Sequence, residues 1–125
     1  MRLVLCLLLT LAAAPAWAEW VKLDETAETT FYIRIDFATF RRDGNVRRVW
    51  SITDRKQRDK YGAMSTQVLS EYDCEEKRYR FLSISALSDS MAKGSTISSN
   101  ADPGKWDYIP PGTMSESIFK MVCAL

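Results

Sequence analysis

The stretch MSTQVLSEYDCEEKRYRFLSISALS, residues 64–88, decides the fold. It holds two long runs with the composition of β-strands, residues 64–74 and 78–88, and three charged residues at 75–77 separate them. In the second run the side chains alternate between two faces, with Leu82, Ile84 and Ala86 on one and Tyr79, Phe81 and Leu87 on the other. Because both faces carry apolar groups, we expect neither to be fully solvated.

The segment upstream of this stretch shows the same period of two. Residues 29–36 alternate and predict a strand. After the turn signal Asp43-Gly44, residues 46–53 predict the partner strand. The shorter elements that we expect are a strand over 20–23, a turn over 24–28, a strand over 95–99 and a stiff connection over 100–112.

The end of the chain changes from a period of two to the period of a helix. Thr113 and Glu116 have the spacing of a capping box, and Ile118, Met121 and Val122 recur on one helical face. A helix of about ten residues is not stable alone in water, so it must pack on the sheet. The sequence therefore predicts an α+β fold: a single antiparallel β-sheet with a short C-terminal helix packed on one face.

The first eighteen residues have the pattern of a cleaved secretory signal peptide. Arg2 precedes the apolar run 3–14, and Ala16-Trp17-Ala18 has the Ala-x-Ala form of a cleavage site. The apolar run is shorter than the roughly 20 residues that span a bilayer, which argues against a membrane anchor. We expect cleavage after Ala18 and a single exported domain over residues 19–125.

The cysteine count predicts one disulfide. Cys6 belongs to the leader and leaves with it, so the exported domain keeps Cys74 and Cys123. In an oxidising compartment such a pair predicts a bridge, which would tie the C-terminal helix to the sheet. Closing a loop of this length stabilises the fold by about 4 kcal/mol. The alternative is a redox-active pair, but the Cys-x-x-Cys spacing that lowers a thiolate pKa is absent.

The sequence contains no pattern of residues that is typical of a catalytic site. The chain has no histidine, which removes the commonest general base and metal ligand. Two acid pairs, Asp24-Glu25 and Glu75-Glu76, fall at predicted turns, where solvated carboxylates are more common than a catalytic pair. No serine lies in a Gly-x-Ser-x-Gly elbow, and no calcium-binding loop pattern is present. We expect a protein that is not an enzyme, with no catalytic residue and no metal site.

Charge is unevenly distributed along the chain. Between residues 34 and 60 there are nine basic residues against four acids, whereas the domain without Arg2 has equal numbers of both. This asymmetry has two interpretations: a contact surface for acidic glycans, polyanionic proteins or lipid head groups, or a set of solvated charges without a partner. Nucleic acid is not an expected partner of a neutral exported protein. The segment 54–63 is predicted to be an exposed loop, and the candidate contact residues are Arg41, Arg42, Arg47, Arg48, Arg55, Lys56, Arg58 and Lys60.

Four large aromatic residues have two interpretations. Trp20, Trp50, Trp106 and Tyr72 could form a binding surface, but in a domain of this size they more often form the core, which we favour. An apolar stripe on the sheet face away from the helix would predict a dimer interface, because monomers seldom leave such a patch in water.

The order of several short motifs along the chain points to a known family. They are Glu19-Trp20-Val21, Phe31-Tyr32-Ile33, Arg42-Asp43-Gly44-Asn45-Val46, Val49-Trp50, Glu71-Tyr72-Asp73-Cys74, Arg80-Phe81-Leu82-Ser83 and Pro110-Pro111-Gly112-Thr113 before Cys123. Together they resemble the surface-adhesin protein E family of small exported bacterial proteins. The resemblance spans essentially all of residues 19–125.

This resemblance implies an antiparallel sheet with a C-terminal helix tied by the Cys74–Cys123 bridge, and a tendency to dimerise. In the family's namesake it also implies adhesion to host matrix and serum proteins, and haem binding. Because the chain lacks histidine, only Met, Tyr or Lys could serve as axial haem groups, so we expect no cofactor. The loop 54–63 does not match the namesake's binding loops residue by residue, and no binding residue is carried over.

We therefore expect a non-catalytic envelope protein that binds a macromolecular partner, either a host matrix or serum protein or a polyanion, and that forms a homodimer. The expected location is the periplasm or the outer-membrane surface of a Gram-negative bacterium, with no transmembrane segment in residues 19–125. The alternative is a periplasmic accessory or inhibitor protein that is not exposed on the cell surface.

Overall fold

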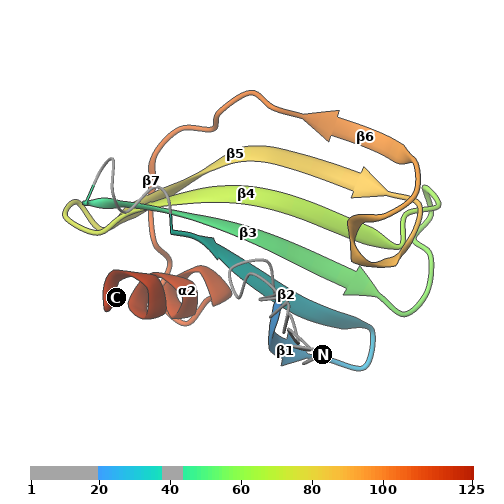
Figure 1. Ribbon diagram of the computed structural model, residues 1–125, viewed down its shortest axis with the longest axis horizontal. Helices are drawn as coiled ribbons and strands as arrows, with labels where there is room; N and C mark the ends of the chain where they lie inside the picture. The colour runs from blue at the N-terminus through green and yellow to red at the C-terminus, as the bar shows by residue number, and fades with distance from the viewer. Residues whose placement is uncertain (1–19, 38–43) are drawn as a thin grey trace, which may run out of the picture.

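The computed structural model describes residues 20–37 and 44–125. The expected signal peptide, residues 1–18, and the contact candidates Arg41 and Arg42 lie outside the described residues. The described part forms one sheet of seven strands and a C-terminal helix (Figure 1). The elements are β1 (Val21–Glu25), β2 (Thr29–Asp36), β3 (Val46–Arg55), β4 (Ser65–Asp73), β5 (Arg78–Leu87), the 3-10 turn η2 (Ser90–Ala92), β6 (Thr96–Asn100), β7 (Asp107–Tyr108) and α2 (Met114–Cys123).

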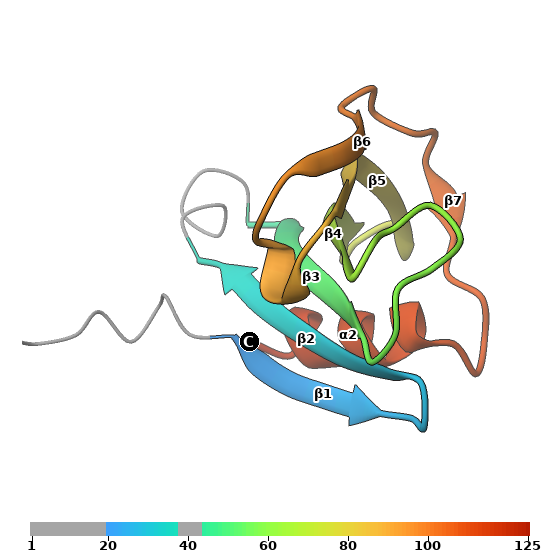
Figure 2. The same ribbon diagram turned by 90° about the vertical axis from the view of Figure 1, so that its right-hand side faces the viewer.

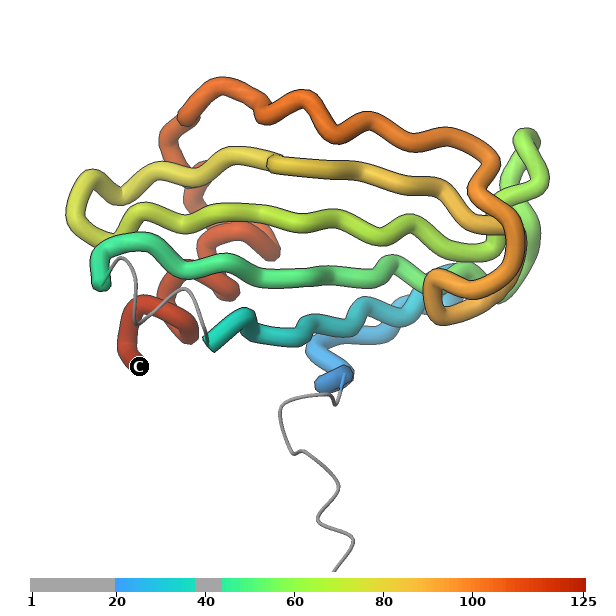
Figure 3. Tube along the Cα trace, turned by 45° about the horizontal axis from the view of Figure 1, so that its top comes forward, coloured from blue at the N-terminus to red at the C-terminus, as the bar shows by residue number. Residues whose placement is uncertain are grey.

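The sheet is an antiparallel meander. Its strands lie in the order β1-β2-β3-β4-β5-β6, so that each strand pairs with the next one in the chain (Figure 3). The two-residue strand β7 pairs with the beginning of β5, where the sequence predicts a connection without a strand. The predicted α+β class and the single antiparallel sheet are confirmed.

Two strands are longer than the sequence predicts. Asp24 and Glu25 continue β1 instead of forming a turn, and a bulge after Lys22 lets them stay paired with β2. Asp54 and Arg55 were expected in the loop, but both extend β3. Asp54 is paired on both sides, with Thr30 and Ser65, because neighbouring strands continue past it and pairing satisfies its backbone groups.

A bulge in β5 corrects the predicted division of its side chains between two faces. Leu69 lies opposite Ser83, and the next residue of β4, Ser70, lies opposite Phe81, so Leu82 is the extra residue. The extra residue inverts the alternation beyond it. As a result Tyr79 and Phe81 share a face with Ile84 and Ala86 rather than opposing them.

The helix packs on one face of the sheet, as predicted (Figure 2). Ile118 and Val122 are buried against Ile33, Val49 and Tyr72, one residue from each of β2, β3 and β4. Thr113 begins the helix, and its hydroxyl oxygen accepts a hydrogen bond from the Glu116 amide at 3.3 Å. The Glu116 carboxylate accepts a hydrogen bond from the Gly112 amide. In a standard capping box this second bond comes from the amide of the N-cap residue, here Thr113, so the predicted cap forms with the donor one residue earlier.

The predicted disulfide joins the helix to the sheet. Cys74 follows β4, and Cys123 is the last residue of α2. Their sulfur atoms are 2.05 Å apart and their Cα atoms 5.6 Å apart, which confirms the pairing. None of the helices in the described residues has the length and apolar character needed to cross a membrane.

Candidate functional site

The structure does not bring the contact candidates among its described residues together on one surface. Arg47 and Arg48 lie at the beginning of β3, and Arg55 is its last residue. With a rise of about 3.4 Å per residue, the two ends of this strand are roughly 30 Å apart. Of the other five candidates, Arg41 and Arg42 lie outside the described residues. The last three, which we call the loop cations, follow Arg55 in the β3–β4 loop, and they are Lys56, Arg58 and Lys60.

Arg48 is held by an ion pair within the sheet. It lies directly opposite Glu71 of β4, and Glu71 in turn lies opposite Arg80 of β5. Arg48 Nε is 3.2 Å from one Glu71 carboxylate oxygen, and Arg80 Nη2 is 2.8 Å from the other. The Glu71 side chain is 7% exposed. The carboxylate therefore neutralises part of the charge on both guanidinium groups and holds Arg48 against the sheet, which leaves Arg48 poorly available to a partner.

Arg47 projects to the other face of the sheet. Its register partner is Tyr72, and it donates a hydrogen bond to the Gly44 carbonyl. Adjacent residues of a strand point in opposite directions, so Arg47 and Arg48 cannot form one convergent patch.

The aromatic residues do not form a common core. Tyr72 is 2% exposed and belongs to the core beside the helix, but the three tryptophans are half-buried. Trp20 lies beside the Arg34 guanidinium, 4.9 Å from ring centroid to carbon. Trp106 lies beside both Arg78 and Arg80. Our expectation of an aromatic core is thus right for Tyr72 and wrong for the tryptophans.

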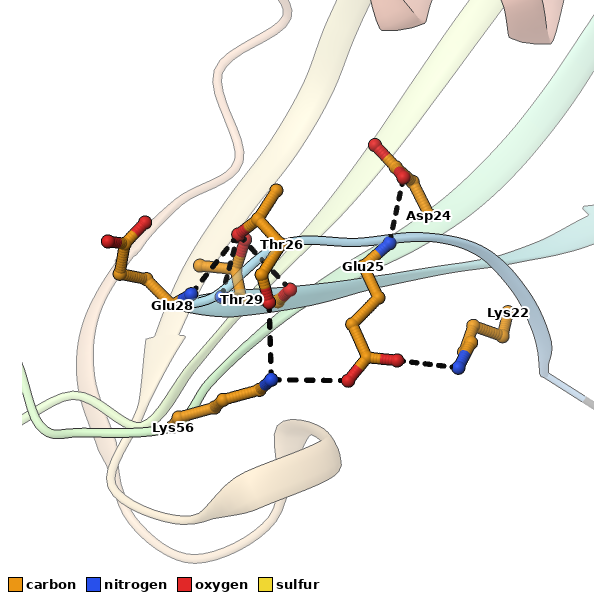
Figure 4. Close-up of polar contacts among 7 residues, drawn as sticks. All are labelled: Lys22, Asp24, Glu25, Thr26, Glu28, Thr29 and Lys56. Carbon is orange, nitrogen blue, oxygen red and sulfur yellow. Dashed lines mark hydrogen bonds and ion pairs between the residues drawn. The ribbon is translucent and has the colours of Figure 1, made fainter.

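Lys56 ties the loop to the β1–β2 hairpin (Figure 4). Its ammonium group donates to a Glu25 carboxylate oxygen and to the Thr26 carbonyl, both at 3.2 Å. The other Glu25 oxygen accepts from Lys22 at 2.7 Å. These hydrogen bonds, first from Lys22 and then from Lys56, hold the pKa of Glu25 below its ordinary value. One carboxylate therefore faces two ammonium groups, so their charges are only partly compensated.

The rest of the loop is organised by Asp59. One of its carboxylate oxygens accepts from the amides of Tyr61 at 2.8 Å and Ala63 at 2.9 Å. The hydrogen bond from Ala63 is the largest cause that lowers the pKa of Asp59. Ala63, expected within the exposed loop, is in fact buried. The loop thus turns its one acid toward its own backbone.

Arg58 and Lys60 remain exposed on this loop. Arg58 donates to two neutral carbonyls, those of Gly62 and Ser88. The Lys60 ammonium group lies 5.0 Å from the Tyr61 ring centroid. In the part of the chain that the structure describes, neither cation has a carboxylate within ion-pair distance.

A shallow depression of about 270 Å³ lies where the loop meets the β1–β2 turn. Arg55, at its edge, has a buried Nε without a hydrogen-bond partner among the described residues. Cations outnumber carboxylates in its lining, which suits an anionic group. The lining residues are Ala27, Glu28, Arg55, Lys56, Gln57 and Arg58.

Among the described residues, no three Cys, Asp or Glu side chains come close enough together to hold a metal ion. Glu75 and Glu76 lie exposed in the β4–β5 turn. The distinguishing feature of the surface around the β3–β4 loop is the positive charge of the loop cations.

A comparison with protein families decides the kinship. The model of the family described as Surface-adhesin protein E matches residues 20–124. The chain belongs to this family. Among curated proteins and among solved structures, no match is found. Membership makes the chain an adhesin-like protein of an exported surface family and implies a non-enzymatic role, and the resemblance of the short motifs is confirmed.

Sequence reasoning missed the Arg48–Glu71–Arg80 row and the position of Trp106. The signal for the row is present, because opposite charges at matching positions of three strands are typical of cross-strand pairs. It can be recognised only once the strand register is known. The bulge at Leu82 shows that register cannot be counted from alternation alone.

Proposed function

We propose that the chain is a non-catalytic envelope protein that binds an acidic partner, a polyanion or an acidic face of a host matrix or serum protein, through the loop cations. In this proposal residues 1–18 are removed on export, and the domain 19–125 carries the binding surface.

The single observation that carries the proposal is the uncompensated charge of the β3–β4 loop. Arg58 and Lys60 are exposed and bond only to neutral groups among the described residues, and Asp59 directs its carboxylate to the amides of Tyr61 and Ala63. Exposed cations of this kind attract polyanions over a distance set by the Debye length, about 10 Å in 0.1 M salt. The depression beside them has room for one anionic group.

Arg47 and Arg48 drop out of this proposal as direct contacts. They lie at the opposite end of β3 from the loop and point to opposite faces of the sheet. Arg48 in addition bonds the nearly buried carboxylate of Glu71, so replacing it would disturb the sheet. The proposal therefore moves the contact surface toward residues 55–60.

Heparin affinity of the purified domain 19–125 tests the proposal. The variant Lys56→Gln/Lys60→Gln removes two charges from the loop, and Lys77→Gln/Lys120→Gln removes two exposed charges elsewhere as a matched control. We expect the loop variant to elute from heparin at clearly lower salt than the control. Equal elution of the two variants would reject the loop as the contact surface.

The cellular location of the protein is tested separately. An adhesin lies on the cell surface, whereas the alternative, an accessory or inhibitor protein, stays in the periplasm. Protease added to intact cells should degrade an adhesin at the exposed Lys56 to Lys60 loop, whereas a periplasmic protein stays intact until the outer membrane is opened. Full protection on intact cells would reject the adhesin and retain the alternative.

A further inference from the structure

A second depression lies at the other end of the sheet from the loop cations. It has a volume of about 210 Å³ and is lined by Glu76, Arg78, Trp106, Asp107 and Tyr108. Strand β7, which lies beside the beginning of β5 (Figure 1), carries two of the lining residues. In its pairing with β5, Tyr108 lies opposite Arg78. Nothing in the proposed function uses these residues.

The ring of Tyr108 is unusually exposed. It is 82% accessible, although the strand that carries it is anchored to the sheet. A large aromatic side chain with no packing role in the described fold suggests a contact surface, because it offers area at little cost in side-chain entropy. Trp106, two residues before it, forms an adjoining wall of the depression.

The wall that Trp106 provides is fixed in place. Its ring centroid is 4.7 Å from the Arg78 guanidinium carbon and 4.5 Å from that of Arg80, which are cation–π distances. Arg78 is itself held by Asp73 at 3.1 Å. The aromatic wall is therefore formed before any ligand arrives, which lowers the entropy cost of binding.

The polar groups around the rings include both acceptors and donors. Glu76 is exposed in the turn, and the Asp107 carboxylate accepts from the Tyr108 amide at 2.8 Å, which keeps it at the rim. Carboxylates accept hydrogen bonds, the Arg78 guanidinium donates them, and the Tyr108 hydroxyl does both. A ligand that fits must offer an apolar face together with groups that donate and accept.

We propose that this depression binds a neutral glycan, with one sugar ring seated against Tyr108 and Trp106. A pyranose with equatorial hydroxyls has flat C–H faces for aromatic rings, and its hydroxyls both donate and accept. The volume is below the roughly 300 Å³ of pockets that enclose drug-sized ligands, as expected for a site that takes one ring of a chain.

The charge and hydrogen-bonding capacity of the site argue against other ligands. Two carboxylates face one guanidinium that Asp73 already compensates, so an anionic polymer would be repelled. A proline-rich peptide could pack on the rings, but its backbone has few N–H groups to donate to Glu76 and Asp107. The hydroxyls of a neutral sugar can donate to both carboxylates and accept from Arg78.

Titration of the domain 19–125 with neutral tetrasaccharides of glucose, N-acetylglucosamine and galactose, followed by NMR, tests this proposal. We expect at least one to bind, and Tyr108→Ala to weaken that binding by about tenfold or more, the effect of losing about 1.4 kcal/mol. Tyr61→Ala is the matched control, because Tyr61 is 70% exposed near the opposite end of the sheet. Absence of binding by all three sugars, or equal loss in both variants, would overturn the proposal.

Two further arms separate this site from the loop cations. Binding of a neutral sugar should not change between low and high salt, whereas heparin binding should fall. The loop variant Lys56→Gln/Lys60→Gln should bind the sugar as the wild type does. If an octaproline peptide binds at Tyr108 and no sugar does, the glycan assignment is wrong.

Discussion

Arg48 of β3 and Glu71 of β4 lie directly opposite each other, with 3.2 Å between the Arg48 Nε and a Glu71 carboxylate oxygen. The other oxygen of the same carboxylate bonds Arg80 of β5. A single side chain thus joins three neighbouring strands on the face away from the helix. The consequence for function is that Arg48 belongs to the fold, and that the cationic surface must be sought elsewhere.

Replacing the carboxylate of Glu71 should destabilise the domain. Glu71→Gln leaves two guanidinium groups facing each other without a counter-charge, and the arginines are about a third exposed, so we expect a loss of about 2 kcal/mol. Urea unfolding measures this loss. The control Glu76→Gln, at an exposed turn position, should change stability by less than about 0.5 kcal/mol. Equal effects of the two substitutions would show that the Arg48–Glu71–Arg80 ion pairs do not contribute to stability.

The disulfide should supply a large part of the stability. Its two cysteines are 49 residues apart, so opening the bridge restores entropy to the unfolded chain worth about 4 kcal/mol. Cys74→Ser/Cys123→Ser should unfold at much lower urea than the wild type. The same shift should follow when the wild type is reduced. A reduced protein as stable as the oxidised one would contradict the structural role of the bridge.

Much of the architecture follows from local patterns in the sequence. The alternation over residues 29–36 predicts β2, and the cap at Thr113 with the spacing of Ile118 and Val122 predicts α2, because these patterns record which face each element buries. The cysteine count predicts the bridge once Cys6 is assigned to the leader and the domain to an oxidising compartment.

The arrangement of side chains on the sheet could not be predicted in the same way. The extra residue Leu82 inverts the faces of β5, and its position depends on pairing with β4. Whether Arg47, Arg48 and the loop cations converge depends on strand register and on strand length, which are set by tertiary contacts. The basic composition of residues 34–60 therefore suggests a cationic surface, but the sequence cannot show where on the fold it lies.

Acid should weaken the fold partly through Asp73. Burial alone would raise its pKa, but hydrogen bonds from the Glu76 amide, the Arg78 guanidinium and the Glu75 amide outweigh burial and lower it. A carboxyl with a lowered pKa stabilises the fold above the pKa of the unfolded chain, near 3.8, and this stability is lost as the pH falls through the folded value.

Urea midpoints at about pH 7 and about pH 3 measure this effect. Asp73→Asn should lower the midpoint at the higher pH and reduce the drop between the two values. Part of the drop should persist, because the pKa values of Glu25 and Asp59 are also lowered. An unchanged drop in Asp73→Asn would mean that Asp73 is not responsible.

High pH should destabilise the fold through Tyr72, in the core beside the helix. Burial raises the pKa of Tyr72 to about 12, against an ordinary value of 10.0, and the hydrogen bond with Ser115 opposes this only in part. Since the unfolded chain ionises first, stability should fall as the pH rises from about 10 to about 12. Spectrophotometric titration should show one tyrosine that ionises last, and Tyr72→Phe should remove it. A Tyr72→Phe profile that keeps the late step would contradict the assignment.

In our proposal, the basic segment divides into cations that hold the sheet and cations that meet a partner. The most direct measurement is a paired one, in which the unfolding midpoint and the heparin affinity are determined for Arg48→Ala and for Lys56→Gln/Lys60→Gln. We predict that Arg48→Ala loses stability and keeps most of its affinity, while the loop variant loses affinity and at most the small stability that the exposed Lys56–Glu25 pair contributes. The reverse pattern, with heparin affinity lost in Arg48→Ala and retained in Lys56→Gln/Lys60→Gln, would contradict this division.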